Sequence, residues 1–347
     1  MLNLPTRSSL IVTGQTLIVG GFGAWIATLI GAPIAVLTGP AVLVALVALA
    51  GFRTGIDNGV RDVAFLIIGV GIGSGVDTDA TQAMLRWPLA FAVLGVMLWA
   101  TLWICARVLE RGFGLPRRSA YLAAAPGHLS FVVSLSSALD LDTTRIVVIQ
   151  SVRLLALTLS VPVIAMVFGY EITDQITPPG LPIAWSHLGI LLIVGLLIGY
   201  IFDRIGLPAA LLIGGMTASS LGHSTGLTPG VLPPWLTYLG LITVGTLIGA
   251  RFDGITRTAL LQSLAAGLTA TAITTAMAVF AALAVAYALA LDPTHVLIAF
   301  APGGLETMIA MGVVLGANPG FVAACHVARL LFLTFLIPAF VGRIRRG

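Results

Sequence analysis

Long apolar stretches recur along the whole chain, separated by short segments that are polar or contain Gly and Pro. A helix needs about 20 mostly apolar residues to cross the hydrocarbon core of a bilayer, which is about 30 Å thick. The pattern therefore predicts an all-α polytopic membrane protein. The predicted spanning helices are 11–31, 34–51, 60–76, 88–110, 144–168, 187–203, 207–222, 235–251, 258–291 and 319–341.

Two further apolar stretches, 119–139 and 294–317, are interrupted by the steps Pro126-Gly127 and Pro302-Gly303. Proline lacks the backbone N–H and glycine is costly within a helix, so each step is expected to break its helix. Irregular backbone at membrane depth needs protein or a watery cavity to satisfy its polar groups. The N–H groups freed at each break would bind an anion, whereas the alternative is a kink that packs closely against a neighbouring helix.

The second half of the chain repeats the first at an offset of 176 residues, as between Pro126 and Pro302. At the same offset, Arg153-Leu154-Leu155 matches Arg329-Leu330-Leu331. A register kept over most of each half indicates an internal duplication. Each copy contains five predicted spanning helices and one broken element. We therefore predict a first membrane repeat over 1–170, a periplasmic linker over 171–186 and a second membrane repeat over 187–347.

The composition agrees with a membrane protein, because 58% of the residues are hydrophobic and only 9% are charged. Soluble domains carry roughly 25% charged residues, so a soluble enzyme, a disordered regulator and a fibrous protein are excluded. The net charge of +4 does not indicate nucleic-acid binding, because the longest polar connection, 169–186, is acidic and Pro-rich. Cys105 and Cys325 lie in apolar stretches and indicate neither a disulfide nor a metal site. No cofactor is indicated.

All 17 basic residues are arginines, and their distribution orients the helices. If both broken elements re-enter the membrane and the N-terminus is cytoplasmic, the arginines outside the helices fall on the cytoplasmic side, except Arg86. If the broken elements cross instead, Arg145, Arg204, Arg251 and Arg257 move outside. The re-entrant arrangement is therefore favoured, with both termini cytoplasmic and the two repeats inverted. Inverted repeats are typical of secondary transporters, whose solute sites lie near the midplane between the repeats.

Arg153 and Arg329 occupy matching places in the last helix of each half. A charge at membrane depth costs roughly 2.5–3.5 kcal/mol on insertion scales and therefore normally has an interior partner. Three interpretations stay open. The guanidinium groups bind a carboxylate or phosphate, they cap carbonyls freed by the breaks or pair with Glu306, or they extend toward the membrane surface.

Glu306 lies in the first turn after the second break. It either carries a coupling proton or cation, or it is a first-turn acid stabilised by the helix dipole. Its counterpart Ser130 is a typical capping residue, which is consistent with the second interpretation. His128 and His326 are candidates for a proton relay because imidazole titrates near neutrality. The counterpart of His326 is Gln150, which forms hydrogen bonds without titrating, so hydrogen bonding is the need that both repeats share.

The spacing Gly-x-x-x-Gly occurs at 69–73 and again at 245–249. Such pairs allow close packing of membrane helices, and the alternative is close approach of a solute. Asp77 and Asp253 end these two helices and are expected to be solvated.

The most distinctive motif begins at Ala301 as Ala-Pro-Gly-Gly-Leu-Glu-x-Met. It continues as Leu-Gly-Ala-Asn-Pro-x-Phe-Val-Ala-Ala from Leu315 and as His-x-x-Arg-Leu from His326. Together with the step Gly-x-Pro-x-x-x-Leu-x-Gly at Gly31 and at Gly206, it resembles the AbrB family of duplicated bacterial membrane proteins. The resemblance covers essentially the whole chain.

This resemblance implies a multi-pass inner-membrane protein and kinship with cation/anion antiporter-like transporters. Gly127 is followed by His128 rather than by a second glycine, and Ser130 replaces the acid, so a symmetric acidic pair is not expected. The labels given to members of the family disagree, between ammonia monooxygenase and regulator of gene expression.

We therefore expect a secondary transporter of a small, anionic solute, coupled to protons or sodium, with the bilayer and a second copy of the chain as partners. The alternative is a membrane sensor that alters gene expression through a partner protein. A copper monooxygenase is disfavoured, because the candidate ligands His128, His326 and Glu306 are scattered; no catalytic or metal site is predicted. The predicted solute-binding residues are Pro126, Gly127, His128, Ser130, Arg153, Pro302, Gly303, Gly304, Glu306, His326 and Arg329.

Overall fold

The computed structural model describes residues 6–74, 87–167 and 180–342. Within these residues the secondary structure is helical, and the only β pairing is an isolated bridge between Pro182 and Val231. The expected all-α fold is confirmed. Asp77, Arg86 and most of the predicted linker lie outside the described residues.

The helices follow the order expected from the hydropathy pattern. The first half contains α1 (Arg7–Leu29), α2 (Ala35–Leu49), α3 (Asn58–Gly73), α5 (Trp87–Phe113), α6 (Arg117–Ala124), α7 (Leu129–Ala138) and α8 (Thr143–Val167). The second half contains α9 (Trp185–Arg204), α10 (Ala210–Ser224), α11 (Pro234–Gly249), the 3₁₀ turn η2 (Ala250–Phe252), α12 (Arg257–Leu289), α13 (Pro293–Phe300), α14 (Leu305–Val314) and α15 (Pro319–Val341).

The two halves have the same helix order, and their breaks match residue for residue. Both ends of α6 and α7 lie 176 residues before the corresponding ends of α13 and α14. The turns recur as well, because Ile34 before α2 and Ala209 before α10 both adopt positive φ angles, of 47° and 48°. The Pro-Gly steps fall in the gaps between α6 and α7 and between α13 and α14, so both predicted breaks are confirmed.

Seven helices among the described residues are long and apolar enough to cross a membrane: α1, α5, α8, α9, α11 with η2, α12 and α15. Three other predicted spans, 34–51, 60–76 and 207–222, form helices that are short for crossing a membrane. The helices α2, α3 and α10 have 15, 16 and 15 residues. At about 1.5 Å per residue they are only about 23 Å long, less than the hydrocarbon core.

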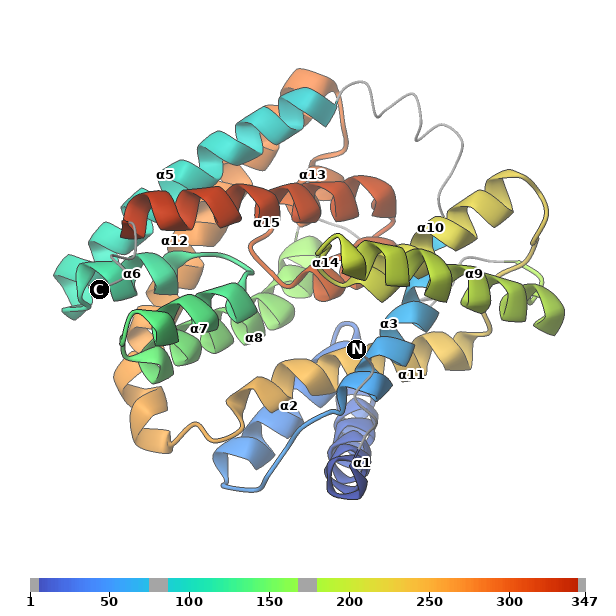
Figure 1. Cartoon of the computed structure of the whole chain (residues 1–347), viewed down its shortest axis with the longest axis horizontal. Coiled ribbons are helices and arrows are strands. Elements are labelled where there is room, and N and C mark those ends of the chain that lie inside the picture. Colours follow the sequence, from blue (N-terminus) through green and yellow to red (C-terminus); the bar gives the residue numbers. More distant parts are fainter. Residues whose placement is uncertain (1–5, 75–86, 168–179, 343–347) are drawn as a thin grey trace.

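The helices form two bundles, and each bundle takes the same elements from both halves (Figure 1). The first, which we call the glycine bundle, contains α1–α3 and α9–α11. The second, the broken-helix bundle, contains α5–α8 and α12–α15. In Figure 1 the broken-helix bundle occupies the left and upper part of the view, and the glycine bundle occupies the right and lower part.

Glycines bring the backbones of the two repeats together in the glycine bundle. A Cβ added to Gly69 on α3 would lie 2.1 Å from the carbonyl oxygen of Leu212 on α10. A Cβ added to Gly245 on α11 would lie 2.3 Å from the carbonyl oxygen of Leu37 on α2. The Gly-x-x-x-Gly spacing therefore serves helix packing. Because each repeat offers the same surface to the other, the contacts are reciprocal, as in a two-fold symmetric interface.

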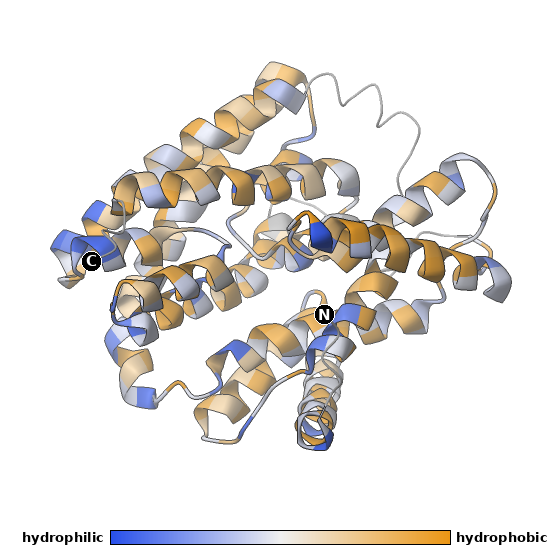
Figure 2. Cartoon of the chain, viewed as in Figure 1, coloured by the Kyte–Doolittle hydropathy of each residue, from blue (hydrophilic) through white to orange (hydrophobic). Residues whose placement is uncertain are grey.

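The outer surface of the helices is apolar. Ile18, Phe280, Tyr287 and Phe335 are 74%, 79%, 93% and 76% exposed. Figure 2 shows apolar residues predominating along α9, α12 and α15, while strongly polar residues gather near helix ends. So many large exposed apolar side chains mark a surface that contacts lipid. The protein is an integral, multi-pass membrane protein.

Two hydrogen bonds join segments that are far apart in the sequence. The backbone N–H of Thr54 donates to Asp253 Oδ1 at 2.7 Å, which joins a loop of the first half to the end of α11 and η2. Arg145 Nη2 donates to the carbonyl oxygen of Phe113 at 2.8 Å. Phe113 precedes the first broken element and Arg145 follows it, so the two ends of this element lie close together. Asp253 is exposed, as expected, but it also holds the Thr54 loop.

Candidate functional site at the two helix breaks

The last turn of α6 has carbonyl groups without helical partners, and α8 supplies donors for them. In a continuous helix the carbonyl of Leu122 would accept from residue 126, but Pro126 has no N–H. Gln150 Nε2 takes this place and donates to the carbonyl oxygen of Leu122 at 2.8 Å. Gln150 is 4% exposed, so the bond is shielded from water.

Arg153 caps the rest of this helix end. Its Nη1 donates to the carbonyl oxygens of Ala123 and Ala124, both at 3.3 Å, and its Nη2 donates to that of Ala125 at 2.7 Å. Only 2% of Arg153 is exposed. The guanidinium group therefore replaces the missing helical donors at a break inside the protein, and it does not extend to the membrane surface.

Arg329 on α15 does the same at the second break. It donates from Nη1 to the carbonyl oxygen of Ala301 and from Nη2 to that of Gly303, the latter at 2.7 Å. It is 1% exposed, and its Nε has no hydrogen-bond partner among the described residues. Both predicted arginines thus hold backbone carbonyls of the breaks in their own repeats. No ion pair between Arg329 and Glu306 occurs in the described part of the chain.

The two breaks also face each other. Gly127 has a φ angle of +87°, and a Cβ added to it would lie 3.1 Å from Arg329 Nη2 and 3.2 Å from the carbonyl oxygen of Gly303. A side chain at position 127 would therefore press on the second break. The glycine allows the two duplicated breaks to meet at one point in the broken-helix bundle.

A cavity of about 370 Å³ lies beside this point, between the two bundles. The broken-helix bundle contributes both breaks, the N-terminal ends of α7 and α14, and part of α8. The glycine bundle contributes the turn before α10 and η2. The lining residues are Gly127, His128, Leu129, Gln150, Ser151, Arg153, Leu154, Gly206, Pro208, Ala209, Arg251, Pro302, Gly303, Gly304, Leu305, Glu306 and Leu330.

Seven of the eleven predicted site residues therefore line one cavity, and three lie behind its wall. The seven are Gly127, His128, Arg153, Pro302, Gly303, Gly304 and Glu306. Pro126, His326 and Arg329 are buried and are not among the lining residues. Ser130 lies in the first turn of α7, but its side chain is outside the described part of the structure.

Glu306 lies where two cavities meet. It lines the cavity at the breaks and also a wider cavity of about 830 Å³. Leu154, Ala209 and Arg251 line both as well. The wider cavity is lined further by Arg61, Asp62, Asp203 and Arg204 near the ends of α3 and α9. Among the described residues, Glu306 has neither an ion pair nor a hydrogen-bonded side-chain partner. Its carboxylate is half-buried and faces the cavity without a counter-charge in contact.

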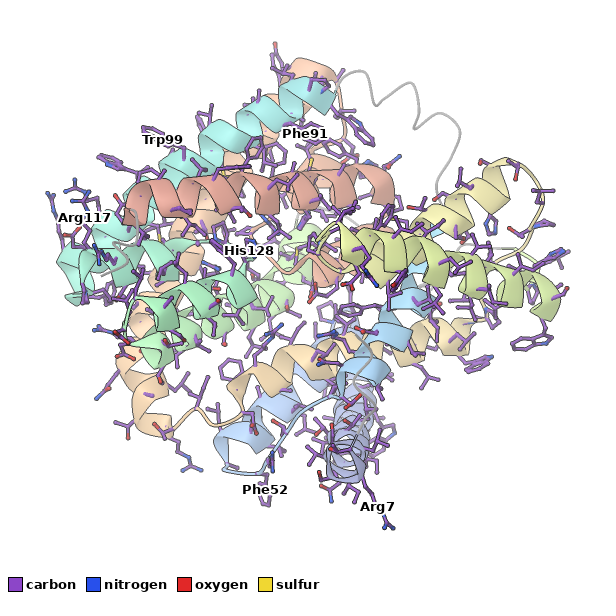
Figure 3. The ribbon with its side chains drawn as sticks, viewed as in Figure 1. Arg7, Phe52, Phe91, Trp99, Arg117 and His128 are labelled. Carbon is purple, nitrogen blue, oxygen red and sulfur yellow. The ribbon has the colours of Figure 1, made fainter. Side chains whose placement is uncertain are left out.

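The two candidate histidines have different surroundings. His128 lines the cavity, and its Nε2 lies 3.3 Å from Thr334 Oγ1 on α15. In the view of Figure 3 the label of His128 lies near the middle of the molecule and that of Arg117 at its edge, and His128 is half-buried. His326 is fully buried, and its Nδ1 lies 2.9 Å from the carbonyl oxygen of Val322. Its Nε2 has no partner in the described structure.

The sequence interpretation missed Ser151 and Arg251. Ser151 is 1% exposed, lines the cavity, and its Oγ has no hydrogen-bond partner among the described residues. Ser151 lies two residues before Arg153 on α8, and this closeness to a candidate residue is the sequence feature that could have indicated it. Arg251 was assigned only to a membrane face, because nothing local indicates that η2 turns toward the breaks.

The family described as "Transition state regulatory protein AbrB" matches residues 36–345, which include both breaks and both arginines. The chain belongs to the AbrB family. The expected resemblance is confirmed, and this member of the AbrB family contains the duplicated break with its arginine cap in both copies.

Two curated relatives are similar over most of their length. "Putative regulator AbrB" from Escherichia coli strain K12 is 24% identical over 322 residues, which is 88% of this chain and 89% of that protein. "Uncharacterized protein YhjN" from Bacillus subtilis strain 168 is 22% identical over 299 residues, which is 79% of this chain and 76% of that protein. The likeness to these two proteins thus extends over both repeats of the AbrB-family chain.

Proposed function

We propose that this chain is a secondary transporter of a small solute with an anionic group, and that it binds the solute in the cavity at the two breaks. The observation that carries the proposal is the place of this cavity. It lies between two bundles that are each assembled from both repeats, and it contains both broken elements. Membrane transporters place their solute sites at such repeat interfaces, beside discontinuous helices.

The contacts between loops support the re-entrant, inverted arrangement of the repeats. If the broken elements crossed the membrane, Thr54 and Asp253 would lie on opposite faces, and so would Phe113 and Arg145. Both pairs are within hydrogen-bond distance. The arginine distribution supports a cytoplasmic position of both termini, in a chain proposed to lie in a bacterial inner membrane. Arg61, Arg204 and Arg251 line the wider cavity, which supports a cytoplasmic opening next to Glu306.

The two repeats differ at equivalent turns, as expected for one state of an alternating-access cycle. Ala209 is half-buried and lines both cavities, whereas its counterpart Ile34 is only 6% exposed and belongs to the main hydrophobic core. In the opposite state the turn at Ile34 would open and the turn at Ala209 would close. Such an exchange moves one bundle against the other around the breaks.

The helix ends at the cavity support an anionic group on the solute. The first N–H groups of an α-helix have no acceptor within the helix and carry the positive end of its dipole. The first residues of α7 and α14 line the cavity, and no side chain caps α7 through its N-cap residue His128. Since Arg153 and Arg329 are occupied by carbonyls, the helix ends rather than the guanidinium groups are the anion donors in this proposal.

Glu306 is the carboxylate available for a positive charge. Either a coupling proton or sodium ion, or a positive group on the solute, would bind there. Its place at the junction of the two cavities is on the path from the wider opening to the breaks.

A second candidate function is a membrane sensor that acts on gene expression through a partner protein. The family description and the name of the Escherichia coli relative both refer to regulation, and they favour it. A sensor would bind a ligand in the same cavity without moving it across the membrane.

Transport by purified protein in sealed proteoliposomes separates these functions. We would record current on solid-supported membranes, and radiotracer exchange in parallel, with panels of small carboxylates, phosphates, amines and amino acids. A transporter gives saturable current or exchange for one class. The variant Glu306→Gln should change this current or exchange. Glu110→Gln on α5 is the same substitution away from both cavities and should leave it unchanged. Silence in both assays, with retained ligand binding, would overturn transport in favour of the sensor.

A further inference from the structure

The duplicated helices α7 and α14 have diverged where they meet the cavity. In the second repeat Glu306 lies in the first turn of α14 and is the acidic residue there. In the first repeat the first turn of α7 has no acidic residue, and Ser130 occupies the matching position. One helix N-terminus thus carries its own negative charge and the other does not.

The α14 end of the cavity is suited to a cation. The carboxylate of Glu306 compensates the positive end of the α14 dipole and still faces the cavity. Arg329 interacts with this carboxylate electrostatically but forms no ion pair with it in the described part of the chain, and its Nη atoms, like those of Arg153, are bonded to carbonyls of the breaks. Arg251, which also lines the cavity, is exposed and forms no ion pair with it in the described structure. A half-buried carboxylate without a paired cation attracts a positive group.

The α7 end is suited to an anion, for a second and independent reason besides the helix dipole. Ser151 is one of the residues that line the cavity, and its Oγ is buried and has no hydrogen-bond partner among the described residues. Buried hydroxyl groups normally have a partner, so this one is available for a ligand. Its counterpart in the second repeat is Val327, which has no hydrogen-bonding side chain. The extra polar group therefore belongs to the repeat whose helix end lacks an acid.

The lining of the cavity also includes four leucines, and the space is small. Leu129, Leu154, Leu305 and Leu330 line it, and its volume of about 370 Å³ is at the lower end for small-molecule sites. The starts of α7 and α14 lie close together, because the breaks meet at Gly127 and Gly303. A solute that contacts both helix ends would therefore carry its two charges close together, with its apolar part against the leucines.

We propose that the solute is a small zwitterion, an amino-carboxylate whose ammonium group binds Glu306 and whose carboxylate binds the N-terminus of α7 and Ser151 Oγ. The inference rests on the proposed function, since it names the solute of the same cavity. It assigns Glu306 to the solute rather than to a coupling ion.

The test compares compounds that differ by one charge. The series is 2-aminobutanoate, butanoate and propylamine, repeated with 4-aminobutanoate, butanoate and butylamine, and then with the common amino acids and a betaine. Purified protein is assayed by thermal stabilisation and, in proteoliposomes, by exchange of the labelled compound. We expect a zwitterion to bind and exchange, and the singly charged analogues to be weaker by about tenfold or more, because each leaves one polar end unpaired.

Three variants assign the two ends. Glu306→Gln should weaken the zwitterion about tenfold or more and leave the des-amino carboxylate unchanged or stronger. Ser151→Ala should weaken the carboxylate-containing compounds and leave the amine unchanged. Glu110→Gln should leave all of them unchanged.

Different results would contradict the zwitterion proposal and the transporter proposal. If butanoate or another simple anion exchanges as well as any zwitterion, and Glu306→Gln does not discriminate them, the zwitterion proposal is wrong and the transporter proposal stands. If an amine alone exchanges, the α7 end does not bind a carboxylate. If no class exchanges or generates current, both proposals fail.

Discussion

Arg329 donates from Nη2 to the carbonyl oxygen of Gly303 at 2.7 Å and so ties α15 to a break 26 residues earlier in the chain. Arg153 makes the equivalent connection from α8 to Ala125, also at 2.7 Å. Irregular backbone inside a membrane protein is stable only when its polar groups are satisfied. The main role of the arginine in each repeat is therefore to stabilise the broken helix by satisfying its free carbonyl groups.

Removing either guanidinium group should unfold the protein at a lower temperature. We expect Arg153→Met and Arg329→Met each to lower the free energy of unfolding by about 2–5 kcal/mol, because each buried carbonyl left unpaired costs about 1–3 kcal/mol. Cys105 and Cys325 are fully buried, so a thiol-reactive dye reports unfolding in detergent. Arg251→Met is the matched control, since Arg251 is exposed and has no carbonyl partner among the described residues.

The opposite result would mean that these arginines bind the solute. If Arg153→Met melts like the unchanged protein and only loses solute binding, the guanidinium group is a ligand and not a structural cap.

Replacing His326 by glutamine should be harmless. Pro302 deprives the carbonyl of Ile298 of its helical donor, just as Pro126 does for Leu122, and Gln150 corrects the latter. His326→Gln would place the same donor at the matching position. We therefore expect the free energy of unfolding to change by less than about 0.5 kcal/mol and the transport rate to stay within about twofold of that of the unchanged protein. His326→Leu removes the hydrogen bond between Nδ1 and the carbonyl oxygen of Val322, so we expect it to lower stability by about 0.5–1.5 kcal/mol.

The pair separates hydrogen bonding from proton transfer. Loss of transport in a stable His326→Gln protein would mean that an imidazole proton is needed, and the relay interpretation would then be correct.

The close backbone contacts of the glycine bundle should not tolerate even a methyl group. Gly69→Ala and Gly245→Ala would each place a Cβ 2.1 or 2.3 Å from a carbonyl oxygen of the other repeat, so we expect losses of about 1–3 kcal/mol or more. Gly189→Ala on α9 meets nothing within 4 Å and is the control. It should be neutral or slightly stabilising, by up to about 1 kcal/mol, since alanine is the better helix former. Equal melting temperatures for all three variants would contradict the packing described.

The sequence was sufficient to predict the breaks and the helix order. Proline at 126 and 302 removes a donor whatever the surroundings, and the offset of 176 residues repeats both breaks. Helix ends were less predictable than helix order. The predicted ranges for α2, α3 and α10 are one to three residues longer than the helices, and turns such as the one at Ala209 are built from apolar residues too.

The partners of the two arginines could not be chosen from the sequence. The carbonyls that they bind lie 26–30 residues away, and only the tertiary structure brings α8 and α15 back to the breaks. Ser151 was missed for a related reason. A single serine in an apolar helix usually bonds its own backbone. Only the structure shows that this serine lines a cavity and that its hydroxyl has no partner among the described residues.

The central claim is that the two duplicated turns open to the cavity in alternation, and a matched cysteine pair tests it most directly. Ala209→Cys and Ile34→Cys occupy equivalent turns with nearly equal φ angles, so the strain of substitution is the same in both. The native cysteines are fully buried and give little background. Membrane vesicles of known orientation are treated with an impermeant maleimide, with and without a transported solute. The account predicts that residue 209 reacts from the cytoplasmic side, and that solute makes residue 34 reactive from the periplasmic side while protecting residue 209. Reaction of both positions from the same face, or a reactivity of residue 34 that no solute changes, would contradict it.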